Sequence, residues 1–236
     1  NSIGLANLGV EEYCNSKLPY LNKLDTNFII NIAGYAIEDY IETLRILESN
    51  NGKQVGYEIN ISCPNVKEGG MEFGVDPKMT EKLTNELRKH TNKILIMKLS
   101  PNVTKVEDIA KAAENGGADG VSAINTLVGM GIDIVTRKPK INTILGGLSG
   151  PAIKPIALAN VYKIYKAVKI PIIGLGGIKS INDVLEFILA GADLVQIGTL
   201  NYKEPGIGVR LASELEAYLN QSNISCISEL KGQLNI

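Results

Sequence analysis

The side chains best suited to chemistry lie together in the run Asn60-Ile61-Ser62-Cys63-Pro64-Asn65, which offers a thiol, two carboxamides and a hydroxyl. Just before it, apolar and polar residues alternate over 57–62, which predicts a strand with one polar face. Polar groups on a buried strand need partners, either other side chains or a ligand. Pro64 ends the strand because it lacks a backbone donor. The run therefore fits a ligand site at a strand end, and it also fits a structural cysteine, since buried cysteines are common.

The elements that must position this run alternate between short apolar strands and helices. Helices are predicted over residues 37–49, 77–90, 106–115, 151–168 and 206–221. No linker or composition break interrupts the pattern, so residues 1–236 are predicted to form a single parallel α/β domain. In a β/α barrel the carboxyl ends of the strands carry the chemistry, and Cys63 would lie at such an end. Strands are predicted to begin at Phe28, Tyr57, Ile94, Gly120, Ile170 and Leu194.

Glycine-bearing loops follow the last two predicted strands. Gly176-Gly177 follows the strand at 170–174, and Gly198-Thr199 follows the strand at 194–197. Two successive strand–loop units with exposed backbone amides are how barrels bind phosphate. Many unrelated barrels share this arrangement, so the pattern predicts a phosphate group without identifying the ligand.

Two residues interrupt apolar strands and have alternative explanations. Lys98 is the one charge in its strand and must be paired or functional, for example in a salt bridge with Glu58. Asn31 is either a core amide bonded to a neighbouring strand or a ligand contact. The single histidine, His90, lies in the last turn of a predicted helix among basic residues, where we expect it to be solvated rather than catalytic.

Composition excludes several classes of partner. The chain has 24 basic and 25 acidic residues, so nothing indicates nucleic acid or an anionic membrane surface. No apolar run is long enough to span a membrane, and no signal peptide opens the chain. Cys14, Cys63 and Cys226 are odd in number and widely spaced, which argues against a disulfide framework or a metal site. A cytoplasmic location is therefore expected.

The run from Asn60 to Gly70 resembles the active-site strand and loop of the class 1 dihydroorotate dehydrogenases. Its Val66-Lys67-Glu68-Gly69-Gly70 continuation is similar to the NAD-linked class 1B branch, and so is the stretch from Gly146 to Pro155. The resemblance covers essentially the whole chain. It implies FMN-dependent oxidation of (S)-dihydroorotate to orotate in the synthesis of UMP, with Cys63 as the general base for the C5 proton and hydride passing from C6 to flavin N5.

The resemblance also implies the binding residues and partners. The electrons would continue to NAD⁺ through a second subunit that carries FAD and a [2Fe–2S] cluster, and the catalytic chains would form a homodimer within a heterotetramer. The implied substrate contacts are Asn1, Ile3, Gly4, Leu5, Asn60, Asn65, Asn125 and Thr126. The implied FMN contacts are Asn31, Asn60, Lys98, Ile124, Gly150, Gly176, Gly177, Gly198 and Thr199.

The family fold is a (β/α)₈ barrel, and six predicted strands leave it two short. The resemblance places the first two strands before Asn1, so the chain is expected to be an N-terminally incomplete barrel that does not hold FMN stably by itself. Three alternatives stay open: the fumarate-linked class 1A enzyme, a phosphosugar lyase or aldolase with Lys98 as Schiff base, and an inactive remnant that binds flavin or phosphate weakly. The chain departs from its relatives at 141–145 and at Leu200, which affects local geometry rather than the expected reaction.

Overall fold

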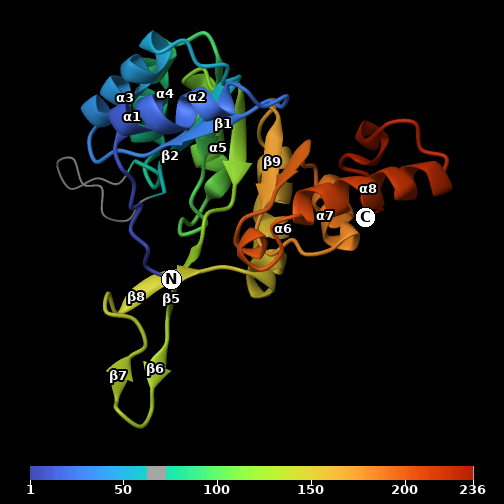
Figure 1. Ribbon diagram of the computed structural model, residues 1–236. Coiled ribbons are helices and arrows are strands. Elements are labelled where there is room, and N and C mark those ends of the chain that lie inside the picture. The colour runs from blue at the N-terminus through green and yellow to red at the C-terminus, as the bar shows by residue number, and fades with distance from the viewer. Residues whose placement is uncertain (63–72, 236) are drawn as a thin grey trace. The chain divides into compact units, whose positions relative to one another are not determined.

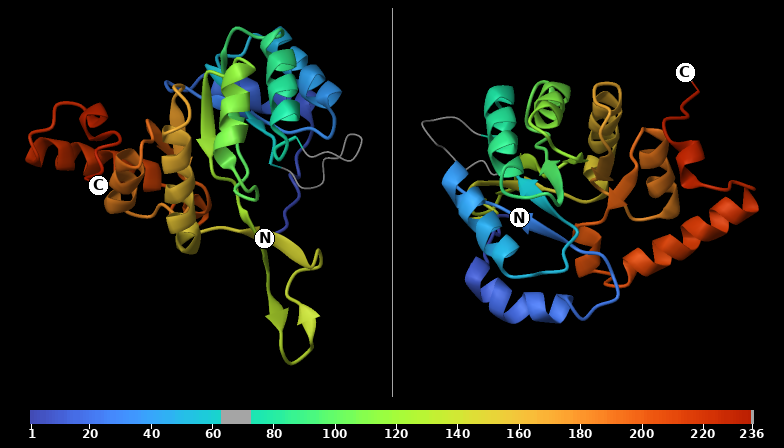
Figure 2. Two further views of the ribbon diagram at one scale, coloured as in Figure 1. Left: turned by 180° about the vertical axis from the view of Figure 1, so that it is seen from behind. Right: turned by 90° about the horizontal axis from the view of Figure 1, so that it is seen from above.

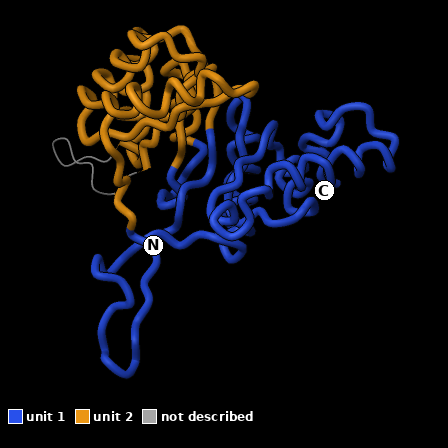
Figure 3. Tube along the Cα trace, in the orientation of Figure 1, with its two compact units in different colours: residues 1–2, 100–107, 122–236 blue, residues 3–99, 108–121 orange. Residues whose placement is uncertain are grey.

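A computed structural model describes residues 1–62 and 73–235 of the chain (Figure 1). The chain divides into two compact units, which Figure 3 distinguishes by colour. One unit comprises Ile3–Leu99 and Asp108–Val121. The other comprises Asn1–Ser2, Ser100–Glu107 and Ser122–Ile236. We call them the N-terminal unit and the C-terminal unit.

The main sheet contains six strands in the hydrogen-bonded order β1-β2-β3-β4-β9-β10. The pairs β1–β2, β2–β3 and β9–β10 are parallel. Apart from β9, which begins two residues later than predicted, these strands begin within about one residue of their predicted starts. The parallel α/β class and the six predicted strands are thereby confirmed. The strands are β1 (Ile29–Ile32), β2 (Gly56–Asn60), β3 (Ile94–Lys98), β4 (Gly120–Ala123), β9 (Ile172–Leu175) and β10 (Leu194–Gln196).

In the N-terminal unit, helices α3 (Ile37–Ser49) and α4 (Pro77–Arg88) lie side by side, as Figure 2 shows. Asp76 begins α4 because its carboxylate accepts a hydrogen bond from the backbone N–H of Lys78, at 2.8 Å. Helix α5 (Val106–Asn115) follows β3. These three helices match the predicted ones closely.

The first helical segment of the N-terminal unit was not predicted. It runs without a break through α1 (Val10–Glu12), a π-helical turn (Tyr13–Lys17) and α2 (Leu18–Leu21). Cys14 and Leu18 are its buried residues. Pro19 and the polar residues of this segment obscure any regular apolar period, which explains why the sequence pattern did not reveal it.

Helix α3 is fixed to β2 by a buried tyrosine. The Tyr40 hydroxyl donates a hydrogen bond to the Asn60 carbonyl oxygen at 2.9 Å, and its ring meets Phe73 edge-on with centroids 5.9 Å apart. Tyr57 of β2 also interacts with Glu48 of α3. Because alternate residues of a strand point to opposite faces, Tyr57 and Ile59 face the helices, and Glu58 and Asn60 face the other way.

In the C-terminal unit, α6 (Lys154–Tyr165) packs on β9 and α7 (Ile181–Leu189) on β10, and α8 (Ile207–Gln221) packs on α7. The predicted helix at 151–168 is a 3₁₀ turn (Pro151–Ile153) followed by α6. Ser180 and Asp183 form a capping box at the start of α7. A second 3₁₀ turn (Thr199–Tyr202) follows β10, and a third (Ile227–Leu230) follows α8.

Two antiparallel ribbons in this unit also escaped prediction. They pair β5 (Leu127–Met130) with β8 (Leu145–Leu148), and β6 (Ile132–Asp133) with β7 (Lys138–Pro139). Figure 1 shows the β6–β7 ribbon continuing beyond β5–β8. Ile134 and Val135 in its turn are 87% and 86% exposed. Strands of two to four residues with several glycines have too little periodicity to be recognised in a sequence.

The tyrosine contact generates a prediction about stability. Replacing Tyr40→Phe removes the hydroxyl and leaves a buried carbonyl with one partner fewer, so unfolding free energy should fall by about 1–2 kcal/mol. Tyr35→Phe is the matched control, because Tyr35 is 65% exposed. Urea unfolding of both variants measures the difference. Equal stability of the two variants would contradict the structural importance of the Tyr40 hydrogen bond.

Candidate functional site

The polar face of the N-terminal unit is assembled by strand register. Asn31 pairs with Glu58 across β1 and β2, and Asn60 pairs with Lys98 across β2 and β3. Residues paired in a parallel ladder share a face, so these four side chains lie on one face of three adjacent strands. All four were expected either in the site or as partners of site residues.

Glu58 is the centre of this face. Its Oε2 accepts a hydrogen bond from Asn31 Nδ2 at 2.6 Å and lies 3.3 Å from Lys98 Nζ. The Glu58 and Lys98 side chains are only 6% and 17% exposed, so this is a largely buried ion pair. The structure thus contains the salt bridge between Lys98 and Glu58 and the hydrogen bond from Asn31 to a neighbouring strand, which the sequence offered as alternatives to ligand contacts, although Asn31 itself is exposed rather than part of the core.

The end of β2 is fixed by its own polar residues. Asn60 is 7% exposed, and its Oδ1 accepts a hydrogen bond from the Ser62 backbone N–H at 3.3 Å. The Ser62 hydroxyl donates to the carbonyl oxygen of Lys98 at 3.0 Å. The second bond ties the carboxyl ends of β2 and β3 together just before Cys63. Cys63 and Asn65, the expected base and one expected substrate ligand, lie outside the described residues.

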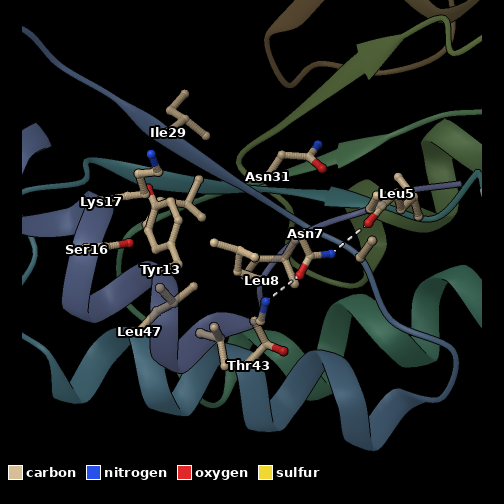
Figure 4. A pocket seen from close by; sticks show the side chains of 16 residues that line it. Leu5, Asn7, Leu8, Tyr13, Ser16, Lys17, Ile29, Asn31, Thr43 and Leu47 are labelled. Carbon is tan, nitrogen blue, oxygen red and sulfur yellow. Dashed lines mark hydrogen bonds between the residues drawn. The ribbon is translucent and has the colours of Figure 1, made fainter. Parts of the chain in front are cut away.

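Ile3, Gly4 and Leu5 are exposed, and Gly4 and Leu5 have φ values of +78° and +57°. Leu5 and Asn31 contribute to the wall of a cavity of about 750 Å³ between residues 5–17, β1 and α3 (Figure 4). Asn7 shapes this segment, because its side chain donates to the Leu5 carbonyl at 2.7 Å and accepts from the Gly9 N–H at 2.8 Å. The cavity wall is otherwise mainly apolar, with residues such as Leu8, Ile29 and Leu47.

The C-terminal unit brings together a second group of expected residues. The backbone N–H of Gly147 donates to the carbonyl oxygen of Asn1 at 2.8 Å, and a Cβ at Gly147 would lie 2.5 Å from the Thr126 hydroxyl oxygen. Asn125 Oδ1 accepts the Thr126 N–H at 2.7 Å. Asn1, Asn125 and Thr126 are therefore close to one another along β5 and β8.

Asn102 belongs to this group and was not anticipated. Its Nδ2 donates to the Thr126 carbonyl at 3.0 Å, and its Oδ1 accepts the Val128 N–H at 3.0 Å. A carboxamide four residues beyond the end of β3 at Lys98 was the available signal. Ile124, an expected flavin contact, is 2% exposed, donates its N–H to the Leu175 carbonyl at 2.9 Å, and follows a cis peptide bond.

The glycine loops of this unit are closely packed. Gly150, Gly176 and Gly177 have φ values of +94°, +135° and +77°, which favour glycine. A Cβ at Gly177 would lie 2.7 Å from the Gly150 carbonyl oxygen, so the two loops approach as closely as backbone can. Leu175 pairs with Gln196, which places the loops after β9 and β10 next to each other. A Cβ at Gly198 would meet no atom within 4 Å, so space remains beside it.

Charged residues surround these loops. Burial raises the pKa of Asp183, but hydrogen bonds from Lys154, Ser180 and the Lys179 backbone outweigh it and hold that pKa below its usual value. The pKa of Lys154 is raised by its bonds to Asp183 and Glu186. The pKa of Arg210 is raised by its bonds to Glu204 and Glu214. The lowered pKa keeps Asp183 ionised at neutral pH, and both cations are paired with carboxylates.

Strand ends with carboxamides and a lysine in the N-terminal unit, and glycine loops after β9 and β10 in the C-terminal unit, are each typical of ligand-binding α/β proteins. Comparison with known proteins identifies the family. The family model described as "Dihydroorotate dehydrogenase" matches residues 1–219. The chain belongs to the dihydroorotate dehydrogenase family and is an oxidoreductase.

Several curated relatives match the whole chain. The "Dihydroorotate dehydrogenase B (NAD(+)), catalytic subunit" of Caldicellulosiruptor bescii is 49% identical over 236 residues, which are 78% of that protein. The proteins of the same name from Geobacter sp. strain M21 and Bacteroides fragilis are 48% and 46% identical, over 77% and 78% of their lengths. Within residues 1–62 and 73–235, no helix has the length and apolar character needed to cross a membrane.

The buried ion pair generates the second prediction. Lys98→Met should lower the unfolding free energy by about 3–5 kcal/mol, because it leaves the Glu58 carboxylate buried without its cation. The double variant Glu58→Gln/Lys98→Met should lose clearly less. Urea unfolding measures both.

Lys89→Met is the control for the loss of a cation, because Lys89 pairs with Glu86 at 2.7 Å on the surface. It should change the unfolding free energy by no more than about 1 kcal/mol. Additive losses from the two substitutions at Glu58 and Lys98 would disprove the coupling between them.

Proposed function

We propose that this chain is the catalytic subunit of an NAD-linked dihydroorotate dehydrogenase, which oxidises (S)-dihydroorotate to orotate in pyrimidine (UMP) biosynthesis. The observation that carries the proposal is identity of 46–49% over the entire chain with proteins named as such catalytic subunits. The polar strand ends and glycine loops described above supply a physical basis for it.

FMN is the cofactor that these residues fit. Gly176, Gly177, Gly198 and Thr199 present backbone at the ends of two adjacent strands, where a phosphate can accept several N–H hydrogen bonds. The space beside Gly198 supports this assignment, because no side chain fills it. We assign Gly150, Ile124, Asn31, Asn60 and Lys98 to the remaining FMN contacts. FMN, when bound, supplies the acceptor for the hydride that leaves C6 of the substrate.

The protein's own part in the reaction is to hold the substrate and move one proton. We assign Cys63 as the base that takes the C5 proton; an ordinary thiol has a pKa near 8.5, so the site must favour the thiolate or a concerted transfer. Side-chain amides and a hydroxyl fix a planar substrate in one orientation, which lowers the entropic part of the barrier. The residues assigned to this task are Asn1, Ile3, Gly4, Leu5, Asn60, Asn65, Asn125 and Thr126.

Lys98 has a defined electrostatic role in this proposal. It shares the polar face of β1, β2 and β3 with Asn31, Glu58 and Asn60, and its charge is balanced by Glu58 at 3.3 Å. A cation held in this way can stabilise negative charge on a reduced flavin ring without adding net charge to the core. The same pairing makes a Schiff-base role for Lys98 less suitable, because a charged lysine is not nucleophilic.

The proposed fold is a (β/α)₈ barrel in which residues 1–236 belong to a single FMN-binding domain. Such a barrel needs two strands in addition to the six described here. The relatives are named catalytic subunits, which supports a partner subunit that passes electrons to NAD⁺. We assign FAD and a [2Fe–2S] cluster to that partner, and a homodimer of this chain to the core of a heterotetramer.

The proton-transfer assignment predicts the behaviour of Cys63→Ala. Reduction of bound FMN by dihydroorotate should slow by roughly 10²–10⁴-fold, the usual loss for a general base, while FMN content stays unchanged. Stopped-flow bleaching of the flavin in the full-length protein measures the rate. Cys226→Ala is the matched control, because Cys226 is an exposed thiol elsewhere in the chain. A rate for Cys63→Ala within a few-fold of wild type would remove Cys63 from the mechanism.

The partner assignment predicts a division of activities. The full-length catalytic chain should bind FMN and be reduced by dihydroorotate alone, yet it should reduce NAD⁺ only after the electron-transfer subunit is added. Absorbance at the flavin and NADH wavelengths follows both reactions. Steady NADH formation by the single chain would contradict the assignment, and fast turnover with fumarate would indicate a class 1A enzyme instead.

A further inference from the structure

A buried carboxylate holds the loop that follows β9. Asp183, which is 3% exposed, accepts three hydrogen bonds on Oδ2: from the backbone N–H of Lys179 at 3.0 Å, and from the N–H and hydroxyl of Ser180 at 2.9 Å and 2.8 Å. A capping box requires only the bond to the N-cap residue. Through the additional bond to Lys179, Asp183 also fixes the loop that begins at Gly176.

The other oxygen of Asp183 reaches a different element. Its Oδ1 accepts a hydrogen bond from Lys154 Nζ at 2.6 Å, and Lys154 is the first residue of α6, just after the Gly150 turn. At the opposite end of the loop, a Cβ on Gly177 would lie 3.1 Å from Lys154 Cβ. The loop is therefore held against the start of α6 at both of its ends.

Arg210 connects this loop to the segment that follows β10. Its Nε and Nη2 donate to the two carboxylate oxygens of Glu204 at 2.6 Å and 3.1 Å, and Nη2 also donates to the Lys179 carbonyl at 3.3 Å. Glu204 follows the 3₁₀ turn that begins at Thr199, and its N–H donates to the Leu200 carbonyl at 2.8 Å. A bond from Arg210 Nη1 to Glu214 at 2.7 Å fixes the guanidinium on α8.

Backbone amides bind phosphate well only when their positions are fixed before the ligand arrives, because otherwise ordering the loops reduces the affinity. We propose, building on the FMN assignment above, that Asp183 and Arg210 are positioning residues. They hold residues 176–180 and 198–204 as one phosphate-binding site, without touching the phosphate themselves. The described contacts of both side chains are with these loops and the helices beside them. We therefore expect substitutions of Asp183 and Arg210 to weaken binding of the phosphate and not binding of the flavin ring.

The test compares two ligands that differ only in the phosphate. Flavin-free full-length protein is titrated with FMN and with riboflavin, for wild type, Asp183→Asn and Arg210→Met. Each substitution should raise the Kd for FMN about tenfold or more, the equivalent of one lost charge-assisted hydrogen bond, and leave the Kd for riboflavin within about twofold. Arg210→Lys should recover little, because lysine lacks the planar fork that reaches Glu204 and the Lys179 carbonyl together.

Lys231→Met is the matched control. It removes a comparable ion pair, to Asp193 at 2.6 Å, in the same unit but at the opposite end of β10. Its FMN and riboflavin affinities should both equal those of wild type. Arg210, whose side chain is 39% exposed, decides the test if Asp183→Asn does not fold.

The outcomes separate the two proposals. If both substitutions weaken FMN and riboflavin equally, or weaken neither, Asp183 and Arg210 are structural residues only, and the FMN assignment stands. If wild-type protein binds FMN no more tightly than riboflavin, the phosphate site itself is wrong and both proposals fall.

Discussion

The burial of one negative charge, at Glu58 in the middle of β2, constrains the N-terminal unit more than any other feature. An ionised carboxylate is costly to remove from water unless a cation and hydrogen-bond donors replace the solvent. Here Lys98 supplies the cation and Asn31 a donor, each from a strand adjacent to β2. Both reach Glu58 only when the three strands keep their present register, since a shift by one residue would turn every side chain to the opposite face. The polar side chains offered to a ligand are thus positioned by a requirement of the core.

The main sheet could be predicted from the sequence because its strands are short, apolar and separated by amphipathic helices, so local pattern and final structure agree. The helical segment 10–21 and the ribbons at 127–148 could not. In the first, a π-helical turn and Pro19 disrupt the period of the apolar residues. In the second, strands of two to four residues are stabilised by pairing with each other, as Leu127 is with Leu148, and sequence alone does not report that partner.

Part of the candidate site could likewise be predicted from the sequence, and part could not. The positions of Asn60, Lys98 and the glycine loops follow from strand ends, which a sequence reveals. The positions of the partners that fix the glycine loops cannot be read from the sequence in this way. Lys154 and Asp183 are 29 residues apart, and Arg210 donates to the carbonyl of Lys179, which is 31 residues away in the sequence. Each of those residues looks like an ordinary helical surface charge when only its neighbours in the sequence are considered. Asn102 was missed for a similar reason, because its importance comes from Thr126, which lies 24 residues later.

The close approach of Gly177 to the Gly150 carbonyl oxygen also restricts how this gene can vary. Any replacement at Gly177 meets two independent penalties: a side chain at a φ of +77°, which costs about 1–2 kcal/mol for most residues, and a collision with a backbone oxygen that no rotamer change relieves. Neighbouring substitutions cannot remove a backbone atom, so compensation would have to move a whole loop. Replacements at Gly177 should therefore destabilise this loop, whereas a replacement at Val209, whose side chain is 77% exposed, meets neither penalty. The substitutions that a position in this chain can accept therefore depend on how closely backbone atoms approach it, as well as on whether its side chain takes part in binding or catalysis.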